Sequence, residues 1–460
     1  LFKAITIIFE QPFISVKKKS SAFYKYCQDM ANGHLSYYDT EEIEAAVLDL
    51  IDSNMIEDAE YLAEHGSQLH PNDETVEKIL VWIYLHHHKA EQAEALYQKY
   101  CNDGTEWSLR MRFAFTVMHG HPKAALDEFF VAFENQLIAS NEWISTIDEM
   151  YEAIPLKVLV PYLIKAIERT EDNAETLGRI GNFLIEAYKI DEAITALEKA
   201  LDIDAYDIYS WQDLARAYLL NDNAEKCLET CEYGLAIDEQ NPLLSFLKGY
   251  ILYNRKENKE CISSLEVARK FAEGKVDARN INIPDAELQD QINVTYEMLG
   301  NAYLDDEQID KAQDCFEILL ERKPEAVFPY VQLSSIHLLK GDLNEALQYI
   351  QQAIEIEPES ESIRSLQISV LTSMRDFDGA LKALKQMTQS KPKNRNFLMA
   401  YAELSLHVGK TKEADKAFRK LLKLGGLEQS HITLVRDYFT SIGDDEALRQ
   451  LEESENKNKK

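Results

Sequence analysis

Small residues recur along this chain at a spacing that constrains its fold more than any other feature. Two series of such positions lie twelve residues apart within each unit, and most steps between units are 34 residues, with single steps of 32, 33 and 51. The step of 51 is 34 plus an insertion of 17. The first series is Gly181, Ala215, Gly249 and Gly300, and the second is Ala59, Ala93, Ala125, Leu159, Ala193, Cys227, Cys261, Ala312, Ala346, Ala380, Ala414 and Ala447. Twelve units with one spacing predict a repeat array.

Each unit has the pattern of two amphipathic helices separated by a polar turn. In residues 300–324 the apolar side chains recur at three and four spacing on both sides of residues 305–307. Proline closes several units, at Pro71, Pro324, Pro358 and Pro392, and suits the start of the next helix, where no N–H is needed. Two helix backbones cross closely only at small side chains, so a larger residue at Ala312 or Ala346 should cost about 1–3 kcal/mol through overpacking.

Composition supports a helical chain and limits the partners. Hydrophobic residues make up 45% of the 460 residues, whereas Gly (16) and Pro (11) are too few for a turn-rich β architecture. The formal charge of −31 repels phosphate backbones and anionic lipid, so we expect no nucleic-acid partner; the densest basic cluster is Lys17–Lys19. The apolar run at 4–9 is too short for a membrane span.

The cysteine pattern predicts reduced thiols and a cytoplasmic location. Six cysteines are sparse in a chain of this length, so no disulfide framework is expected. Cys227 and Cys231 lie four residues apart, on one face of a helix, which would allow a metal or redox pair. Both occupy periodic buried positions, however, and Cys261 fills the same position one unit later. We therefore interpret them as small packing residues.

The repeat resembles the tetratricopeptide pattern, in which a 34-residue helix–turn–helix has a small residue in each helix and a closing proline. Trp211, Leu214, Ala215 and Tyr218 match its first helix, and another copy has Gly300, Tyr303, Ala312, Phe316 and Pro324. The resemblance covers residues 40–451 and weakens before Asn173, where Leu159 replaces a small residue. It implies an all-α, right-handed α-solenoid of about twelve repeats, in which first helices line a concave groove that binds other proteins.

The repeat pattern predicts the domain organisation. We expect an N-terminal segment at 1–39, partly disordered or one short helix, and divergent repeats at 40–172. Regular repeats follow at 173–451, with an insertion at 276–292 and a polar C-terminal cap, and then a charged tail at 452–460. Residues 285–303 have the pattern of one long helix preceded by Pro284. The insertion marks either a binding face or a tolerated loop.

The resemblance also implies which residues contact a partner. Placing the family's groove positions on this chain selects aromatic side chains with a few polar groups, a mixture that suits protein recognition. They are Tyr209, Gln212, Arg216, Phe246, Tyr250, Tyr253, Asn301, Phe328 and Val331. The alternative is that several of them only pack between units. One subclass grips a C-terminal carboxylate through cations, but Glu297 and Gly178 occupy positions where the cation would be needed, so this mode is not supported.

Other candidate chemistry is weak. His86, His87 and His88, with His65 and His70 nearby, could be metal ligands, but adjacent residues at a helix end diverge, and a solvated turn explains the run. Gly409, Lys410 and Thr411 match only the end of a phosphate-binding loop, with Leu404 where its first glycine belongs. We therefore expect no catalytic residues, metal or cofactor.

Three functions stay open, in order of preference. The first is a non-catalytic scaffold that binds a partner peptide or helix in the groove, and the acidic charge suggests a partner with basic segments. The second is a self-assembling structural subunit, a homo-oligomer within a larger complex. The third is a metal-dependent enzyme that uses the histidine run.

Overall fold

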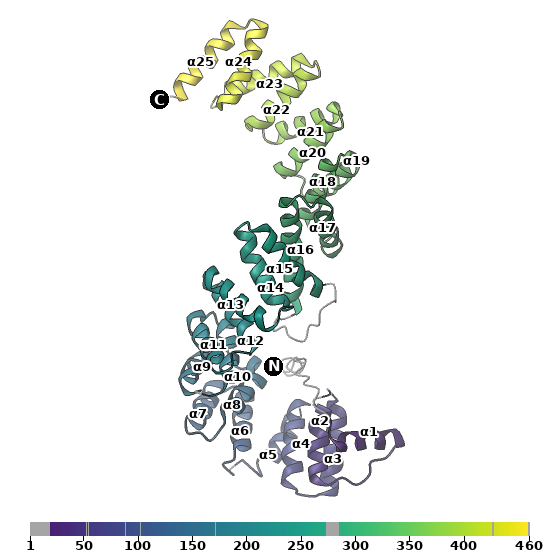
Figure 1. The fold of residues 1–460 in the computed structure, drawn as a ribbon, viewed down its shortest axis with the longest axis vertical. Helices are drawn as coiled ribbons and strands as arrows, with labels where there is room; N and C mark the ends of the chain where they lie inside the picture. Colours follow the sequence, from purple (N-terminus) through teal and green to yellow (C-terminus); the bar gives the residue numbers. More distant parts are fainter. Residues whose placement is uncertain are drawn as a thin grey trace. The chain divides into compact units, whose positions relative to one another are not determined.

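The fold consists of α-helices throughout the part of the chain that the computed structural model describes. This part is residues 19–458 except 52, 54, 88, 102, 171, 273–284 and 426. Within it lie 25 α-helices and one short 3-10 helix, and no strand (Figure 1). The predicted all-α solenoid is confirmed. The predictions for residues 1–18 and for most of the insertion at 276–292 fall outside the described residues.

After one N-terminal helix, α1 (Ser21–Asn32), the helices follow as twelve pairs, as the spacing predicts. A 3-10 helix, η1 (Tyr151–Ala153), interrupts the fourth pair. The pairs are α2 (Thr40–Ile51) and α3 (Ile56–Leu69), α4 (Glu74–His86) and α5 (Ala90–Tyr97), α6 (Glu106–Met118) and α7 (Pro122–Glu134), α8 (Ser140–Glu149) and α9 (Leu156–Arg169), α10 (Ala174–Glu186) and α11 (Ile190–Ile203), α12 (Ile208–Leu220) and α13 (Ala224–Ile237), α14 (Pro242–Asn254) and α15 (Asn258–Ala272), α16 (Asp285–Asp305) and α17 (Ile309–Arg322), α18 (Val327–Lys340) and α19 (Leu343–Ile356), α20 (Glu361–Ser373) and α21 (Phe377–Ser390), α22 (Arg395–His407) and α23 (Thr411–Leu424), and α24 (Gln429–Ile442) and α25 (Asp445–Asn458).

The long helix expected after Pro284 is confirmed as α16, which has 21 residues. The other domain boundaries stay predictions. The described residues divide into two compact units, 19–251 with 270–272, and 252–269 with 285–458. In the first unit one apolar core runs from Phe113 to Ile251, so it passes without a break through the boundary expected at 172. In the second unit the last two pairs enclose a core that includes Phe418 and Phe439. None of the described helices is long and apolar enough to span a bilayer.

The small periodic residues lie where two helices touch. A β-carbon added at Gly181 would lie 2.5 Å from Cγ of Leu197, and one added at Gly300 would lie 2.6 Å from the ring of Phe316. Ala193, the partner position of Gly181, has no exposed surface. Because protein interiors are packed as densely as crystals, the facing side chain fills the space that the missing β-carbon leaves.

A second, polar contact recurs at three places between a first helix and the second helix before it. The hydroxyl of Tyr84 donates to Glu64 at 3.1 Å, and the equivalent Tyr303 donates to Glu266. Tyr218 makes the same contact with Glu198. Burial and the nearby carboxylate raise the pKa of Tyr84 to about 12, so the phenol keeps its proton and remains a donor. This recurring pair joins successive repeats.

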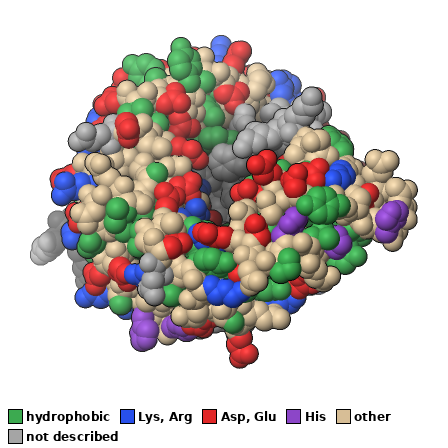
Figure 2. Space-filling view, turned by 90° about the horizontal axis from the view of Figure 1, so that it is seen from below, with side chains coloured by type: hydrophobic (Ala, Val, Ile, Leu, Met, Phe, Trp, Pro, Cys, Tyr) green, Lys and Arg blue, Asp and Glu red, His purple; other side chains and the backbone are tan. Residues whose placement is uncertain are grey.

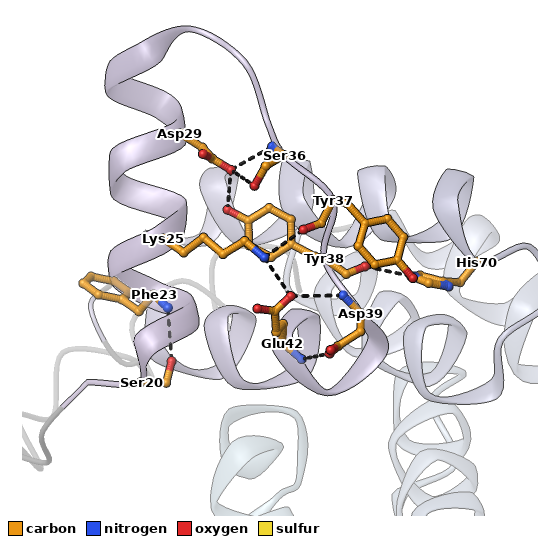
Figure 3. A network of polar contacts seen from close by, with 10 residues as sticks. All are labelled: Ser20, Phe23, Lys25, Asp29, Ser36, Tyr37, Tyr38, Asp39, Glu42 and His70. Carbon is orange, nitrogen blue, oxygen red and sulfur yellow. Dashed lines mark hydrogen bonds and ion pairs between the residues drawn. The ribbon is translucent and has the colours of Figure 1, made fainter.

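The N-terminal helix is attached through a network of polar contacts around one carboxylate (Figure 3). Oδ2 of Asp29 accepts from the backbone N–H of Ser36 at 2.7 Å and from the hydroxyl of Tyr38 at 2.9 Å. The hydrogen bonds from Ser36 lower the pKa of Asp29. Lys25 donates to Glu42 at 2.8 Å, and Nε2 of His70 lies 2.8 Å from the carbonyl oxygen of Tyr38. These contacts fix the loop after α1 against α2 and α3.

Replacing Gly300 by alanine should destabilise the second unit by about 1–3 kcal/mol, because the new β-carbon overlaps the ring of Phe316. In an exposed helix the same change would stabilise by about 0.5–1 kcal/mol, so the sign separates packing from helix propensity. Urea unfolding of the full chain measures it. Adding Phe316→Leu should recover part of the loss, whereas simple additivity of the two changes would contradict the proposed contact.

Candidate protein-binding surface

First helices of successive pairs lie side by side in the first unit. Helix α8 contacts both α6 and α10, and α10 contacts α12. We call the surface formed by α6, α8, α10 and α12, together with residues 242–251 of α14, which share their apolar core, the first-helix face. The polar side chains of this face lie outside the apolar stripe of each helix, so they are available for polar contacts.

One cluster of charges joins α6 to α8. Nε of Arg110 donates to the hydroxyl of Thr146 at 2.8 Å, and the same guanidinium pairs with Glu142. Its Nη2 lies 3.5 Å from Glu149. Burial raises the pKa of the Glu149 carboxyl, because the surrounding protein removes water from its charged form. Arg110 therefore holds two acidic side chains of α8 in position.

A second cluster joins α8, α10 and α12 around a buried carboxylate. Asp213, which is 3% exposed, accepts from Nδ2 of Asn182 at 3.0 Å and from Nη1 of Arg216 at 3.2 Å. Arg179 pairs with Asp148 of α8. Burial raises the pKa of Asp213 to about 6, although Arg216 and Asn182 favour its charged form. An ionised, desolvated carboxylate therefore lies directly beneath the first-helix face.

Asp213 should make the first unit less stable as the pH rises. Its folded pKa of about 6 exceeds the unfolded value of 3.8, so the folded state binds the proton more tightly and loses this advantage as the pH rises from about 4 to 6. Between pH 5 and 7 we expect the stability of an Asp213→Asn variant to rise, relative to the parent chain, by about 1 kcal/mol.

Urea unfolding of both chains at the two pH values measures this difference. The test is the change of the stability difference between pH 5 and pH 7. The hydrogen bonds that the amide alters contribute at both pH values, so they do not affect this change. Asp310→Asn is a matched control, because Asp310 is exposed. A constant difference between the Asp213 variant and the parent chain would contradict the raised pKa.

The structure assigns different environments to the predicted groove residues of the first unit. Gln212 has no exposed surface, so it supports the helix packing and cannot contact a partner in this conformation. Phe246 is half-buried and packs against the core, whereas Tyr250 is 36% exposed. Tyr209 and Arg216 are half-buried, and Arg216 belongs to the Asp213 cluster. Tyr250 is therefore the aromatic side chain of this set with the most accessible surface.

The remaining predicted residues belong to the second unit. Nδ2 of Asn301 donates to the hydroxyl of Tyr253 at 3.2 Å, and Gln332 donates to Oδ1 of Asn301 at 3.3 Å. These contacts form a polar ladder across three first helices. Phe328 packs edge to face on Phe316, with ring centroids 5.7 Å apart, and Val331 packs against a small apolar core. The structure thus brings Tyr253 and Asn301 together and uses Phe328 and Val331 in packing.

Sequence reasoning missed most of the charged residues of the first-helix face, above all Arg110, Arg179 and Asp213. Asp213 could have been noticed, because it is an acidic residue directly before Leu214 and Ala215, two positions that match the repeat pattern. Its partner Arg216 lies on the same helix, but Asn182 could not have been named, because it lies on the preceding first helix, about one repeat away. A carboxylate within a buried helical stripe is a signal that some partner exists.

The weaker candidates also have structural explanations. His87 follows the end of α4, as predicted, but it pairs with the buried Glu60 rather than lying in solvent. No set of three His, Cys, Asp or Glu side chains in the described part of the chain could hold a metal ion. Cys227 and Cys231 have no exposed surface, as the packing interpretation requires. Lys410 is in the turn between α22 and α23 and pairs with Asp378 at 2.6 Å.

The acidic charge of the chain is distributed over its surface. Figure 2 shows Asp and Glu side chains spread more widely than Lys and Arg over the face that it presents. The sequence analysis expected the densest basic cluster at Lys17–Lys19. The structure describes Lys19 of this cluster, and Lys19 contacts Asp49. A larger basic region, which the sequence reasoning overlooked, lies between residues 375 and 423, where there are twelve Lys and Arg and five Asp and Glu.

Comparison with known families supports the repeat assignment. Two profiles described as "Tetratricopeptide repeat" match the chain, one at residues 174–207 and the other at residues 297–361. The first match coincides with the pair α10 and α11, and the second runs from α16 to the start of α20. Residues 174–207 and 297–361 of the chain therefore match tetratricopeptide repeats. The small residues Gly181 and Gly300 both lie within the matched segments.

Its curated relatives are distant and longer than the matched part. Hsp70-Hsp90 organizing protein 3 of Arabidopsis thaliana is 22% identical over 260 residues, which is 51% of this chain and 46% of that protein. Anaphase-promoting complex subunit 7 of Dictyostelium discoideum is 24% identical over 169 residues, or 33% and 29% of the two proteins. The chain therefore spans less than half the length of either relative.

Solved structures of similar proteins cover different shares of this chain. The tetratricopeptide-repeat protein YrrB, described with an unusual peptide-binding site, is 18% identical and covers 44% of this chain and 95% of its own, with a TM-score of 0.36. The Cut9–Hcn1 structure is 13% identical and covers 91% and 92%, with a TM-score of 0.32. Scores this low do not locate a binding site on this chain.

Proposed function

We propose that this chain is a protein–protein interaction scaffold that binds a partner peptide or helix on its first-helix face. The observation that carries the proposal is the arrangement of Tyr250, Phe246 and the Asp213 cluster within one unit. It combines an accessible aromatic ring with charges that neighbouring helices already hold in position. Such preorganised polar groups around aromatic anchors are typical of binding surfaces.

Two further findings support a binding role. Tetratricopeptide repeats match the chain, and its relatives include a protein named for organizing Hsp70 and Hsp90 and a subunit of the anaphase-promoting complex. Both names refer to work with other proteins. A helical array presents a long continuous surface, because each repeat contacts only its neighbours, and this geometry suits extended partners.

The charge of the face suggests the kind of partner. Acidic side chains at its edge, including Glu175 and Glu186, are exposed, and the buried clusters contain more carboxylates than guanidinium groups. We therefore propose that the partner carries basic segments. Its affinity should fall with salt, because interactions between exposed charges are screened beyond about 10 Å at 0.1 M ionic strength.

A photo-crosslinking residue at position 250 tests the proposal. We expect it to capture a partner from a lysate of the source cells, identified by mass spectrometry. Tyr250→Ala should weaken this partner's affinity about tenfold or more, because an accessible aromatic anchor is lost. Its folded state should change little, because the ring is more than one-third exposed. Phe246→Ala is less informative, because removing its core contacts should cost about 2–4 kcal/mol of stability.

The same crosslinker at Tyr206 is the matched control. Tyr206 is 81% exposed in the turn between α11 and α12, outside the first-helix face. Equal capture at both positions, or unchanged affinity in Tyr250→Ala, would contradict the assignment of the face. A crosslinked product that contains only two copies of this chain would instead indicate self-assembly.

A further inference from the structure

The basic region between residues 375 and 423 reverses the charge of the rest of the protein. The whole chain has 49 Lys and Arg against 80 Asp and Glu, but this region has twelve against five. It covers most of α21, α22 and α23 in the second unit, where α22 packs on both α21 and α23. A local excess of cations in so acidic a chain creates a separate positive field, because charges beyond the Debye length are screened.

The lysines occupy the outward sides of two second helices. On α23, Lys412, Lys416, Lys420 and Lys423 recur at three and four spacing, opposite the buried stripe that contains Phe418 and Leu421. On α21, Lys382 and Lys385 are exposed opposite another buried stripe. Position 416 lies one 34-residue repeat after position 382. We call these six side chains the basic block.

The members of the basic block have no ion pair with any described residue, unlike Lys391, Lys410 and Arg419 nearby. Arg419 pairs with Asp415 and Asp444, and Lys410 pairs with Asp378. Lysines four apart on one helix repel each other and weaken the helix. Lys412, Lys416 and Lys420 have this spacing. Their arrangement therefore does not stabilise α23, and its positive field is open to an external anion.

We propose that the basic block binds a short acidic segment of a partner protein. Lys412 and Lys423 are eleven residues apart, about 16 Å along the helix. An extended peptide of about five residues covers this length. A segment rich in Glu and Asp would place its carboxylates along α23 and reach Lys382 and Lys385 on α21. The contact would be exposed, charge-driven and fast to form.

The surroundings of the block disfavour longer polyanions. Outside residues 375–423 the chain has 37 basic and 75 acidic residues, and such a surface repels an extended nucleic acid or an anionic membrane plane. Between residues 375 and 424 the exposed large hydrophobic side chain is Leu406, so the described part of this region offers no exposed Phe, Tyr or Trp ring on which a base could stack. The ring of the exposed His407 packs edge to face on Phe377. A short acidic peptide contacts only the basic block and does not extend over the acidic surface around it.

Fluorescence anisotropy of the full chain tests the proposal with a labelled peptide of about ten glutamates. We expect binding at roughly 50 mM salt that weakens at roughly 150 mM. Lys382→Glu/Lys416→Glu/Lys420→Glu should raise the Kd about tenfold or more, because like charges then face each other. These side chains lie outside the buried stripes, and circular dichroism verifies that the helices persist. A variant with glutamine at the same three positions should show an intermediate loss.

Lys123→Glu/Lys157→Glu/Lys259→Glu is the matched control. These lysines are exposed on α7, α9 and α15, and the triple change alters the net charge by the same amount. We expect the Kd to change less than about twofold, because these charges lie outside the block. An equal loss in the control would overturn the proposal, since net charge alone would then explain binding.

Three other results would also overturn it. The first is no detectable peptide binding at the lower salt concentration. The second is tighter binding, through the same lysines, of a single-stranded DNA oligonucleotide or of vesicles that contain phosphatidylserine. The third is a doubled mass in light scattering that the lysine variant abolishes, because the occupant would then be a second copy of this chain. The block lies on second helices, so none of these results bears on the first-helix face.

Discussion

The close approach of two helix backbones at a residue without a large side chain is the contact on which the rest of this structure depends. At Gly181 and Gly300 the facing Leu197 and Phe316 occupy the position where a β-carbon would lie. Each repeat buries its apolar stripe only if its two helices approach this closely. The contact recurs every 34 residues, so the array is a chain of similar local interfaces. Tyrosine–carboxylate pairs such as Tyr84 with Glu64 then join one repeat to the next.

Because that contact is periodic, the sequence was sufficient to predict the fold. Twelve helix pairs, the long helix α16 and the packing role of Cys227 and Cys231 follow from spacing and residue size alone. The polar contacts of the first-helix face were not predictable in the same way. Asp213 meets Asn182 on the preceding first helix, and such a pair depends on side-chain direction as well as on the repeat. Gln212 is an error of the opposite kind. Its place in the repeat predicts that it lies on the first-helix face, but its side chain is fully buried.

The net charge of the whole chain misled the sequence reasoning more than any other average property did. A formal charge of −31 predicts repulsion of every anion, yet residues 375–423 carry an excess of cations. A sliding window along the sequence would have found this excess. The structure adds what no window can show. Arg419 and Lys410 are neutralised by nearby carboxylates, whereas Lys416 and its neighbours on the outward side of α23 have no such partner among the described residues.

The array also explains how a destabilising group such as Asp213 can persist. In a compact domain a desolvated carboxylate with a pKa of about 6 would weaken the single cooperative core. In a solenoid the loss is confined to the interfaces between α10, α12 and their neighbours, because stability is close to a sum of repeat and nearest-neighbour terms. The first helices can therefore carry a buried carboxylate that costs stability. The periodic small residues lie at the contact between the two helices of a repeat, and they continue to hold these helices together.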